Sequence, residues 1–151
     1  MLRAAADHQG AAFIEIYQNC PIFNDDAFAP IKEPNAPGLI RLEHGSPVRY
    51  GPDGSMGLVY GPYGALTPVE AASVPESELV VHDATRSDPS YAFALSRLDS
   101  FDFAHTPIGV FRSVERPAYD DLMAAQLDQA RASGAGDLAK LLAGSDTWEV
   151  D

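Results

Sequence analysis

Residues 2–17, LRAAADHQGAAFIEIY, decide the predicted fold class of this chain of 151 residues. Leu2 to Gln9 is rich in alanine, the best helix former, and Gly10 stands where a glycine commonly ends a helix. Ala11 to Tyr17 is a short, mostly apolar run between breakers, which favours a buried strand of a parallel sheet. A helix that leads directly into a buried strand predicts an α/β fold. Because the strand before that helix is missing, the chain is expected to begin inside a fold.

The rest of the chain predicts short strands and helices around a long irregular connection. Residues 18–38 contain four prolines and predict that connection, and Phe23, Phe28 and Ile31 predict that it is packed. Two apolar runs, Leu39–Leu42 and Val48–Tyr50, flank a loop that contains glycine, and they predict a β-hairpin. Residues 60–69 are rich in turn formers and are left unassigned. The other predicted elements are a strand at 79–81, a helix from Asp88-Pro89, a strand at 108–114, and helices at 117–133 and 137–143.

Two of the predicted helices have a clear apolar face. Asp88 and Pro89 are typical of a helix start, and Tyr91, Ala94, Leu95 and Leu98 follow on one face. The helix at 117–133 carries an apolar stripe made of Leu122, Met123, Leu127 and Ala130. With only two or three central strands, much of the sheet would lack partners. This is a second indication that a portion is missing.

Charge and hydrophobicity exclude several classes of partner. The chain has 10 Lys and Arg against 22 Asp and Glu, a net charge of −12, and such a surface repels nucleic-acid phosphates and anionic lipid. No apolar run approaches the roughly 20 residues that span a bilayer. The N-terminus lacks the apolar core of a secretory signal. We therefore expect a soluble, cytoplasmic protein with neither nucleic-acid nor membrane partners.

Cys20 is the strongest candidate for a functional residue. It directly follows the first predicted strand, and ligands of open α/β sheets gather at the carboxyl ends of strands. A buried structural thiol is the alternative, because free cysteine is among the most buried residue types. As the single cysteine of the chain, Cys20 can build a metal or cluster site only with ligands from elsewhere.

The other polar residues form no catalytic constellation. The four histidines, His8, His44, His82 and His105, lack the spacing of a zinc site. His44 and His82 each border a predicted strand end and are expected to cap turns. Asp25 and Asp26 are expected to be solvated or capping groups. Arg112 and Arg116 are expected to form ion pairs or interface contacts. No catalytic residue is assigned.

Four segments taken together carry a resemblance to a known family: GAAFIEIYQNCPIFND (10–25), LIRLEHGSPVRYG (39–51), DPSYAFALSRL (88–98) and TPIGVFRSVERPAYDD (106–121). In this order they resemble the C-terminal part of the thiamine-diphosphate-binding β subunit of 2-oxoacid:ferredoxin oxidoreductases, of the 2-oxoglutarate type. The resemblance covers residues 2–125. It implies a C-terminal portion of the cofactor-binding parallel-sheet domain at 1–125, with a β-hairpin insertion, and a variable helical tail at 126–151.

The resemblance also implies a reaction, its cofactors and its partners. The family converts a 2-oxoacid and coenzyme A to an acyl-CoA with reduction of ferredoxin, using thiamine diphosphate, Mg²⁺ and a [4Fe-4S] cluster. The β subunit works with an α/γ subunit. Four of its cysteines hold the cluster, three of them in its N-terminal half, and Cys20 matches the fourth.

Several family motifs are absent from this chain. The early cysteines are missing, and no GDG occurs to begin the segment that binds Mg²⁺ and the cofactor's diphosphate. A truncated subunit that is inactive alone and binds none of these cofactors by itself is therefore expected. An autonomous acidic binding or regulatory domain derived from that subunit is the alternative. A third interpretation is a plain α/β domain in which Cys20 belongs to the core.

Overall fold

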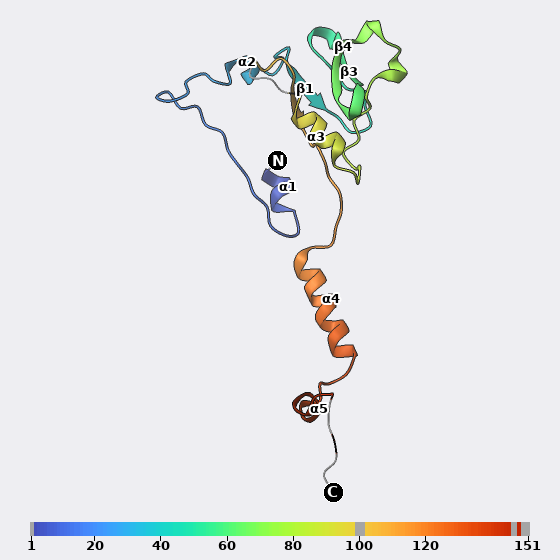
Figure 1. The fold of residues 1–151 in the computed structure, drawn as a ribbon. Coiled ribbons are helices and arrows are strands. Elements are labelled where there is room, and N and C mark those ends of the chain that lie inside the picture. The colour runs from blue at the N-terminus through green and yellow to red at the C-terminus, as the bar shows by residue number, and fades with distance from the viewer. Residues whose placement is uncertain (1, 99–101, 146–147, 149–151) are drawn as a thin grey trace. The chain divides into compact units, whose positions relative to one another are not determined.

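The computed structural model describes residues 2–98, 102–145 and 148. The chain divides into two compact units (Figure 1), one formed by Tyr17–Glu115 and the other by Met1–Ile16 together with Arg116–Asp151. Among the described residues, no helix is both long and apolar enough to cross a bilayer.

The unit Tyr17–Glu115 contains two small sheets. In the first, β1 (Leu39–Leu42) pairs in parallel with β5 (Thr106–Gly109). In the second, β2 (Arg49–Tyr50), β3 (Met56–Tyr60) and β4 (Leu66–Glu70) pair in antiparallel order. A parallel pair together with an antiparallel hairpin confirms the predicted α/β class.

Short helices connect and cover these strands. They are α2 (Ala29–Lys32), α3 (Ser90–Ser96) and four 3₁₀ turns at Pro52–Gly54, Pro62–Gly64, Ala71–Ser73 and Glu76–Glu78. The start of α3 confirms the prediction from Asp88-Pro89, because Asp88 Oδ1 accepts a hydrogen bond from the Ser90 backbone N–H at 2.6 Å. Tyr91 and Leu95 on the predicted apolar face are buried.

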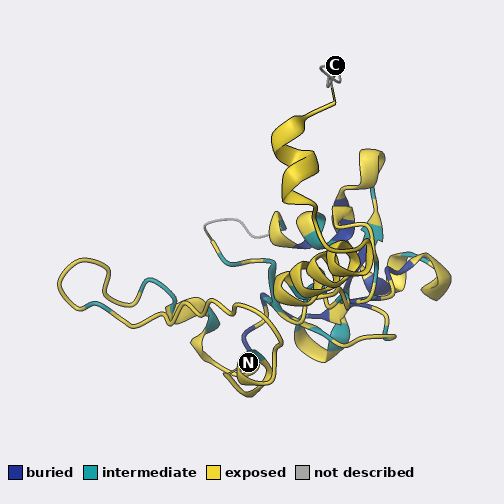
Figure 2. Ribbon diagram, turned by 90° about the horizontal axis from the view of Figure 1, so that it is seen from below, coloured by how far each residue is buried: buried dark blue, intermediate teal, exposed yellow. Residues whose placement is uncertain are grey.

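The core of this unit lies where the two sheets and α3 meet (Figure 2). Ile40 of β1, Leu58 of β3 and Leu95 of α3 are fully buried. Val48, Tyr50, Leu66, Val80 and Tyr91 complete the buried cluster. The core therefore joins residues of β1, β2, β3, β4 and α3.

The predicted hairpin at 39–50 is wrong in its pairing. β1 takes its partner from β5, more than sixty residues later, while β2 pairs with β3 across the Pro52–Gly54 turn. β3 and β4 form a further hairpin, with Pro62–Gly64 at its tip. Local apolar runs predict that strands exist, but long-range contacts decide which strands pair.

The predicted strand at 79–81 is present only in a reduced form. The Val80 N–H donates to the Leu58 carbonyl, and the Val80 carbonyl accepts from the Val48 N–H, both at 2.8 Å. An isolated bridge joins Pro47 and Val81. Val80 is thus buried between two segments without extending into a regular strand.

The predicted strand at Ala11–Tyr17 is wrong for this structure. These residues are exposed and belong to no strand, and Phe13 is 91% accessible. A strand needs a neighbour for its backbone hydrogen bonds, and the described part of the chain offers none to this segment.

The unit of Met1–Ile16 and Arg116–Asp151 contains three helices: α1 (Leu2–Ala6), α4 (Tyr119–Ala132) and α5 (Leu138–Ala143). All three are close to the predicted positions. The apolar stripe of α4 is, however, exposed, with Leu122 57% and Leu127 51% accessible. The periodicity predicted a helix correctly, but no described side chain buries the stripe. The division at 125/126 stays a prediction.

Gly38 provides a test of the β1–β5 junction. Its carbonyl accepts the Thr106 N–H at 2.8 Å, and a Cβ at this position would overlap the backbone oxygen of Phe103. We expect Gly38→Ala to lower the free energy of unfolding by about 1–3 kcal/mol, because backbone must move to admit the methyl group. Gly136→Ala is the control, because a Cβ at this position meets open space. It should change the free energy of unfolding, measured by urea titration, by less than about 0.5 kcal/mol. Equal effects of the two substitutions would contradict this packing.

Candidate functional site

Cys20 lies in a tight turn at the start of the long connection. The Asn24 N–H donates to the Cys20 carbonyl at 2.9 Å, and the two residues form an isolated bridge. The side chain is partly exposed, so the interpretation of Cys20 as a fully buried core thiol receives no support. The backbone N–H groups of Phe23, Ile22 and Asn24 lower the pKa of the Cys20 thiol. These dipoles favour the thiolate, which is the form that binds metals.

Polar side chains hold the loop around this turn in place. Asn19 Nδ2 donates to Asp25 Oδ1 at 2.8 Å, while Asn19 Oδ1 accepts from the Asp26 N–H at 3.0 Å. Lys32 Nζ lies 2.7 Å from Asp26 Oδ1. Asp25 and Asp26 thus form hydrogen bonds within the loop, which agrees with the prediction of solvated or capping groups.

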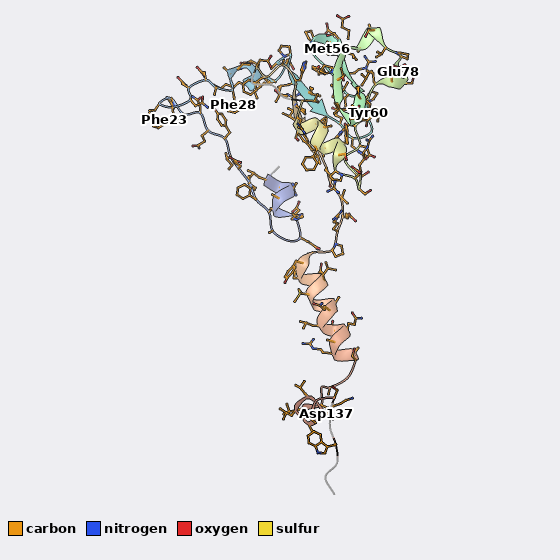
Figure 3. The ribbon with its side chains drawn as sticks, in the orientation of Figure 1. Phe23, Phe28, Met56, Tyr60, Glu78 and Asp137 are labelled. Atoms are coloured by element: carbon orange, nitrogen blue, oxygen red, sulfur yellow. The ribbon has the colours of Figure 1, made fainter. Side chains whose placement is uncertain are left out.

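Aromatic side chains also contact this loop, on which Figure 3 labels Phe23 and Phe28. Phe28 lies with its ring centroid 4.2 Å from that of Tyr17 and 5.2 Å from that of Phe103. Phe23 is 89% exposed. The prediction that apolar side chains pack this connection therefore holds for Phe28 and fails for Phe23.

The donor set around Cys20 fits one ligand of a metal cluster and no more. In the described part of the chain, no three His, Cys, Asp or Glu side chains converge to hold a metal ion. A partly exposed sulfur facing backbone N–H groups has the chemistry of a cluster thiolate, since such hydrogen bonds tune bound clusters. The remaining ligands would have to come from another polypeptide segment.

The histidines near the core serve as hydrogen-bonding groups. His82 is 1% exposed, with Nε2 2.9 Å from the Val110 carbonyl and Nδ1 3.0 Å from the Tyr91 hydroxyl. His44 Nδ1 accepts the Ala84 N–H at 3.2 Å, as expected of a residue that caps a turn. His105 Nδ1 lies 2.9 Å from the Tyr50 hydroxyl.

Two arginines complete the polar framework of this unit. Arg86 lies over the Tyr91 ring, 4.6 Å from its centroid, and donates to the Tyr60 hydroxyl at 2.7 Å. Arg112, predicted as an ion-pair or interface residue, instead donates to the carbonyls of Arg86 and Ser87 at 3.1 and 2.6 Å. Both arginines therefore make contacts within this unit, and neither lies in the Cys20 turn.

Alkylation of Cys20 tests the electrostatics of its turn. Because the lowered pKa increases the thiolate fraction at neutral pH, we expect iodoacetamide to react with the folded chain at a lower pH midpoint than with the urea-denatured chain. Because Cys20 is the single cysteine, mass spectrometry of the intact chain measures the alkylated fraction of Cys20 directly. Identical midpoints in the two states would show that the backbone N–H groups do not stabilise the thiolate.

Comparison with known proteins supplies one informative relative. No protein-family model matches the chain, and no solved structure shows significant similarity. Over its whole length, the chain is 45% identical to 2-oxoglutarate oxidoreductase subunit KorB of Mycobacterium tuberculosis. It spans 41% of the length of that relative. This similarity to a 2-oxoglutarate oxidoreductase subunit agrees with the resemblance found in the sequence.

Proposed function

We propose that the chain supplies the C-terminal part of a 2-oxoacid:ferredoxin oxidoreductase β subunit and is inactive alone. The assembled enzyme would decarboxylate a 2-oxoacid such as 2-oxoglutarate to an acyl-CoA and pass the electrons to ferredoxin. The observation that carries this proposal is 45% identity across the whole chain to a 2-oxoglutarate oxidoreductase subunit. The cytoplasmic location expected from the sequence remains a prediction.

Within that enzyme, Cys20 would be one of four thiolate ligands of a [4Fe-4S] cluster. Its turn supports this role, because the N–H groups of residues 22–24 stabilise negative charge on the sulfur before any metal binds. The Asn19–Asp25 and Asp26–Lys32 contacts limit movement of the turn. The cluster, when bound, supplies single-electron transfer.

The other cofactors would be held outside this chain. Thiamine diphosphate provides the carbanion-stabilising chemistry of such enzymes, and Mg²⁺ binds its diphosphate. The chain has no GDG sequence to begin such a site. The proposed partners are accordingly the remainder of the β subunit, the α/γ subunit and ferredoxin, with the 2-oxoacid and coenzyme A as substrates of the complex.

Ferredoxin reduction tests the proposed reaction. The chain alone is expected to show no 2-oxoglutarate- and coenzyme A-dependent reduction of ferredoxin. Co-expression with the part of KorB that the chain does not match, and with the other subunit of that enzyme, should restore the reaction. The matched control is the same co-expression without this chain. If the assembly containing the chain is no more active than that control, the proposal is wrong.

An autonomous binding or regulatory domain is the second candidate, and the core of Tyr17–Glu115 favours it. That unit buries Ile40, Leu58 and Leu95 completely without any partner. This hypothesis predicts that the purified chain melts cooperatively as an iron-free monomer. The subunit hypothesis predicts aggregation, or dependence on a partner, because apolar side chains are exposed. Thermal melting combined with light scattering separates the two.

A further inference from the structure

A cavity of about 640 Å³ lies within the unit Tyr17–Glu115, away from the Cys20 turn. Its walls are residues 34–37, Leu39 and Arg41 of β1, Arg49 and Tyr50 of β2, and residues 51–54 of the turn between β2 and β3. Small-molecule sites in proteins typically have volumes of about 300–1,000 Å³. The cavity is therefore large enough for a metabolite, and Cys20 is not among its walls.

Two neighbouring strands each contribute one arginine to this cavity. Successive side chains of a strand point to opposite faces. On β1, Ile40 is fully buried in the core, and Arg41 beside it lines the cavity. On β2, Tyr50 is buried and Arg49 beside it is exposed along the cavity wall. The cavity thus carries two guanidinium groups, which are protonated at any physiological pH.

The contacts of these arginines leave both able to bind an anion. Arg41 Nη2 donates to the Pro34 carbonyl at 2.7 Å, which positions the guanidinium and leaves its other N–H groups without a partner in the described part of the chain. Arg49 Nη2 lies 3.5 Å from Glu76 Oε1, and the Glu76 side chain is 73% exposed. Such an exposed ion pair is weak, so a ligand can replace it at little energetic cost.

We propose that this cavity binds a small molecule through a phosphate group, held by Arg41 and Arg49 together. A phosphate has oxygens that point in several directions and accepts hydrogen bonds from two guanidinium groups, whereas one arginine already matches the planar carboxylate. The chain carries a net charge of −12 and repels anions elsewhere, yet a single acid, Asp53, lies in the wall of this described segment. The proposal does not depend on the proposed function.

The remainder of the wall suits the body of a phosphate ester. Pro34, Pro37, Leu39 and Pro52 supply apolar surface beside the arginines. The Tyr50 hydroxyl lies 2.9 Å from His105 Nδ1 and is already hydrogen-bonded. The two arginines are therefore the groups that would hold the phosphate, and the prolines and Leu39 would contact the rest of the ligand.

Calorimetric titration of the full chain tests the phosphate site, with inorganic phosphate and AMP as probes. Both probes should bind to one site, AMP more tightly, whereas adenosine should not bind and succinate should bind at least about tenfold more weakly than AMP. We expect Arg41→Gln/Arg49→Gln to weaken AMP binding at least about tenfold, because two charge-assisted contacts are lost. Arg131→Gln, which removes a side chain 76% exposed in α4, is the control and should leave binding unchanged.

Asp53→Asn supplies a result that a misfolded variant cannot imitate. Asp53 has a positive φ of 54°, which asparagine also adopts, so the turn should be kept. Removing the carboxylate from the wall should strengthen AMP binding about twofold or more, because a like charge is lost.

Several outcomes would overturn the phosphate site. They are no binding of AMP or phosphate, equal binding of adenosine or succinate, unchanged affinity in Arg41→Gln/Arg49→Gln, an equal loss in Arg131→Gln, and no gain in Asp53→Asn. None of these outcomes bears on the cluster, because Cys20 lies outside the cavity. Iron that persists in a Cys20→Ser assembly would, conversely, contradict the cluster proposal and leave the phosphate site standing.

Discussion

The His82→Ala variant is expected to lose about 3–5 kcal/mol of the free energy of unfolding, from the combined loss of a buried ring and its hydrogen bonds. His82 is 1% exposed. The Val110 carbonyl can only accept, so Nε2 donates to it, while Nδ1 lies within hydrogen-bond distance of the Tyr91 hydroxyl. Burial raises the pKa of Tyr91 to about 12, so this hydroxyl keeps its proton at neutral pH. The ring thus connects the residues after β5 to α3.

Urea unfolding of two further variants makes the His82 result specific. Tyr91→Phe removes the hydroxyl but keeps the ring, and should lower the free energy of unfolding by about 1–3 kcal/mol. The His44 side chain is 58% exposed. His44→Ala should therefore lower the free energy of unfolding by about 1 kcal/mol or less, although it also removes a hydrogen bond. If His82→Ala were no more destabilising than His44→Ala, the buried network would not exist in solution.

The Leu58→Ala variant is expected to have an effect of similar size, about 2–5 kcal/mol, because it opens a cavity in the centre of the unit Tyr17–Glu115. Leu58 is fully buried on β3, and its carbonyl accepts the Val80 N–H at 2.8 Å. A typical domain has a stability of only 5–15 kcal/mol, so this loss should shift the urea midpoint strongly.

Val81→Ala is the matched control for Leu58→Ala. Val81 belongs to the same unit and neighbours the same core, but is 47% exposed. Val81→Ala should lower the free energy of unfolding by less than about 1 kcal/mol. Comparable losses for the two variants would mean that the core does not lie between the sheets and α3.

Local signals in the sequence predicted the elements that depend on local physics. Asp88 and Pro89 predicted the start of α3, and the spacing of Tyr91 and Leu95 predicted its buried face. The apolar run at Leu39–Leu42 predicted β1. Each of these features depends on a cap, a helical period or a short apolar run, and all of them are visible within ten residues.

Features that depend on distant partners were missed or misread. The parallel pairing of β1 with β5 cannot be read from the sequence of either strand. The sequence does not predict the β3–β4 hairpin, because Pro62, Tyr63 and Gly64 obscure its strands. Tyr63 adopts a positive φ of 58° at the tip. Ala11–Tyr17 has the composition of a buried strand, but composition does not reveal whether this chain or another one buries it.

The candidate site was predicted unevenly. Cys20 was found from its position after an apolar run, and the structure adds the backbone N–H groups that favour its thiolate. His82 was expected only to cap a turn, because its burial depends on Tyr91 and on Val110, 28 residues later.

Iron content of the assembled subunit tests the central claim most directly. The chain is co-expressed with the part of KorB that it does not match, and iron per complex is measured for Cys20 and for Cys20→Ser, a nearly isosteric change. The account predicts a [4Fe-4S] complement of iron with Cys20, and its loss in Cys20→Ser while the two polypeptides still co-purify. Equal iron in the two complexes would contradict the assignment of Cys20 as a cluster ligand.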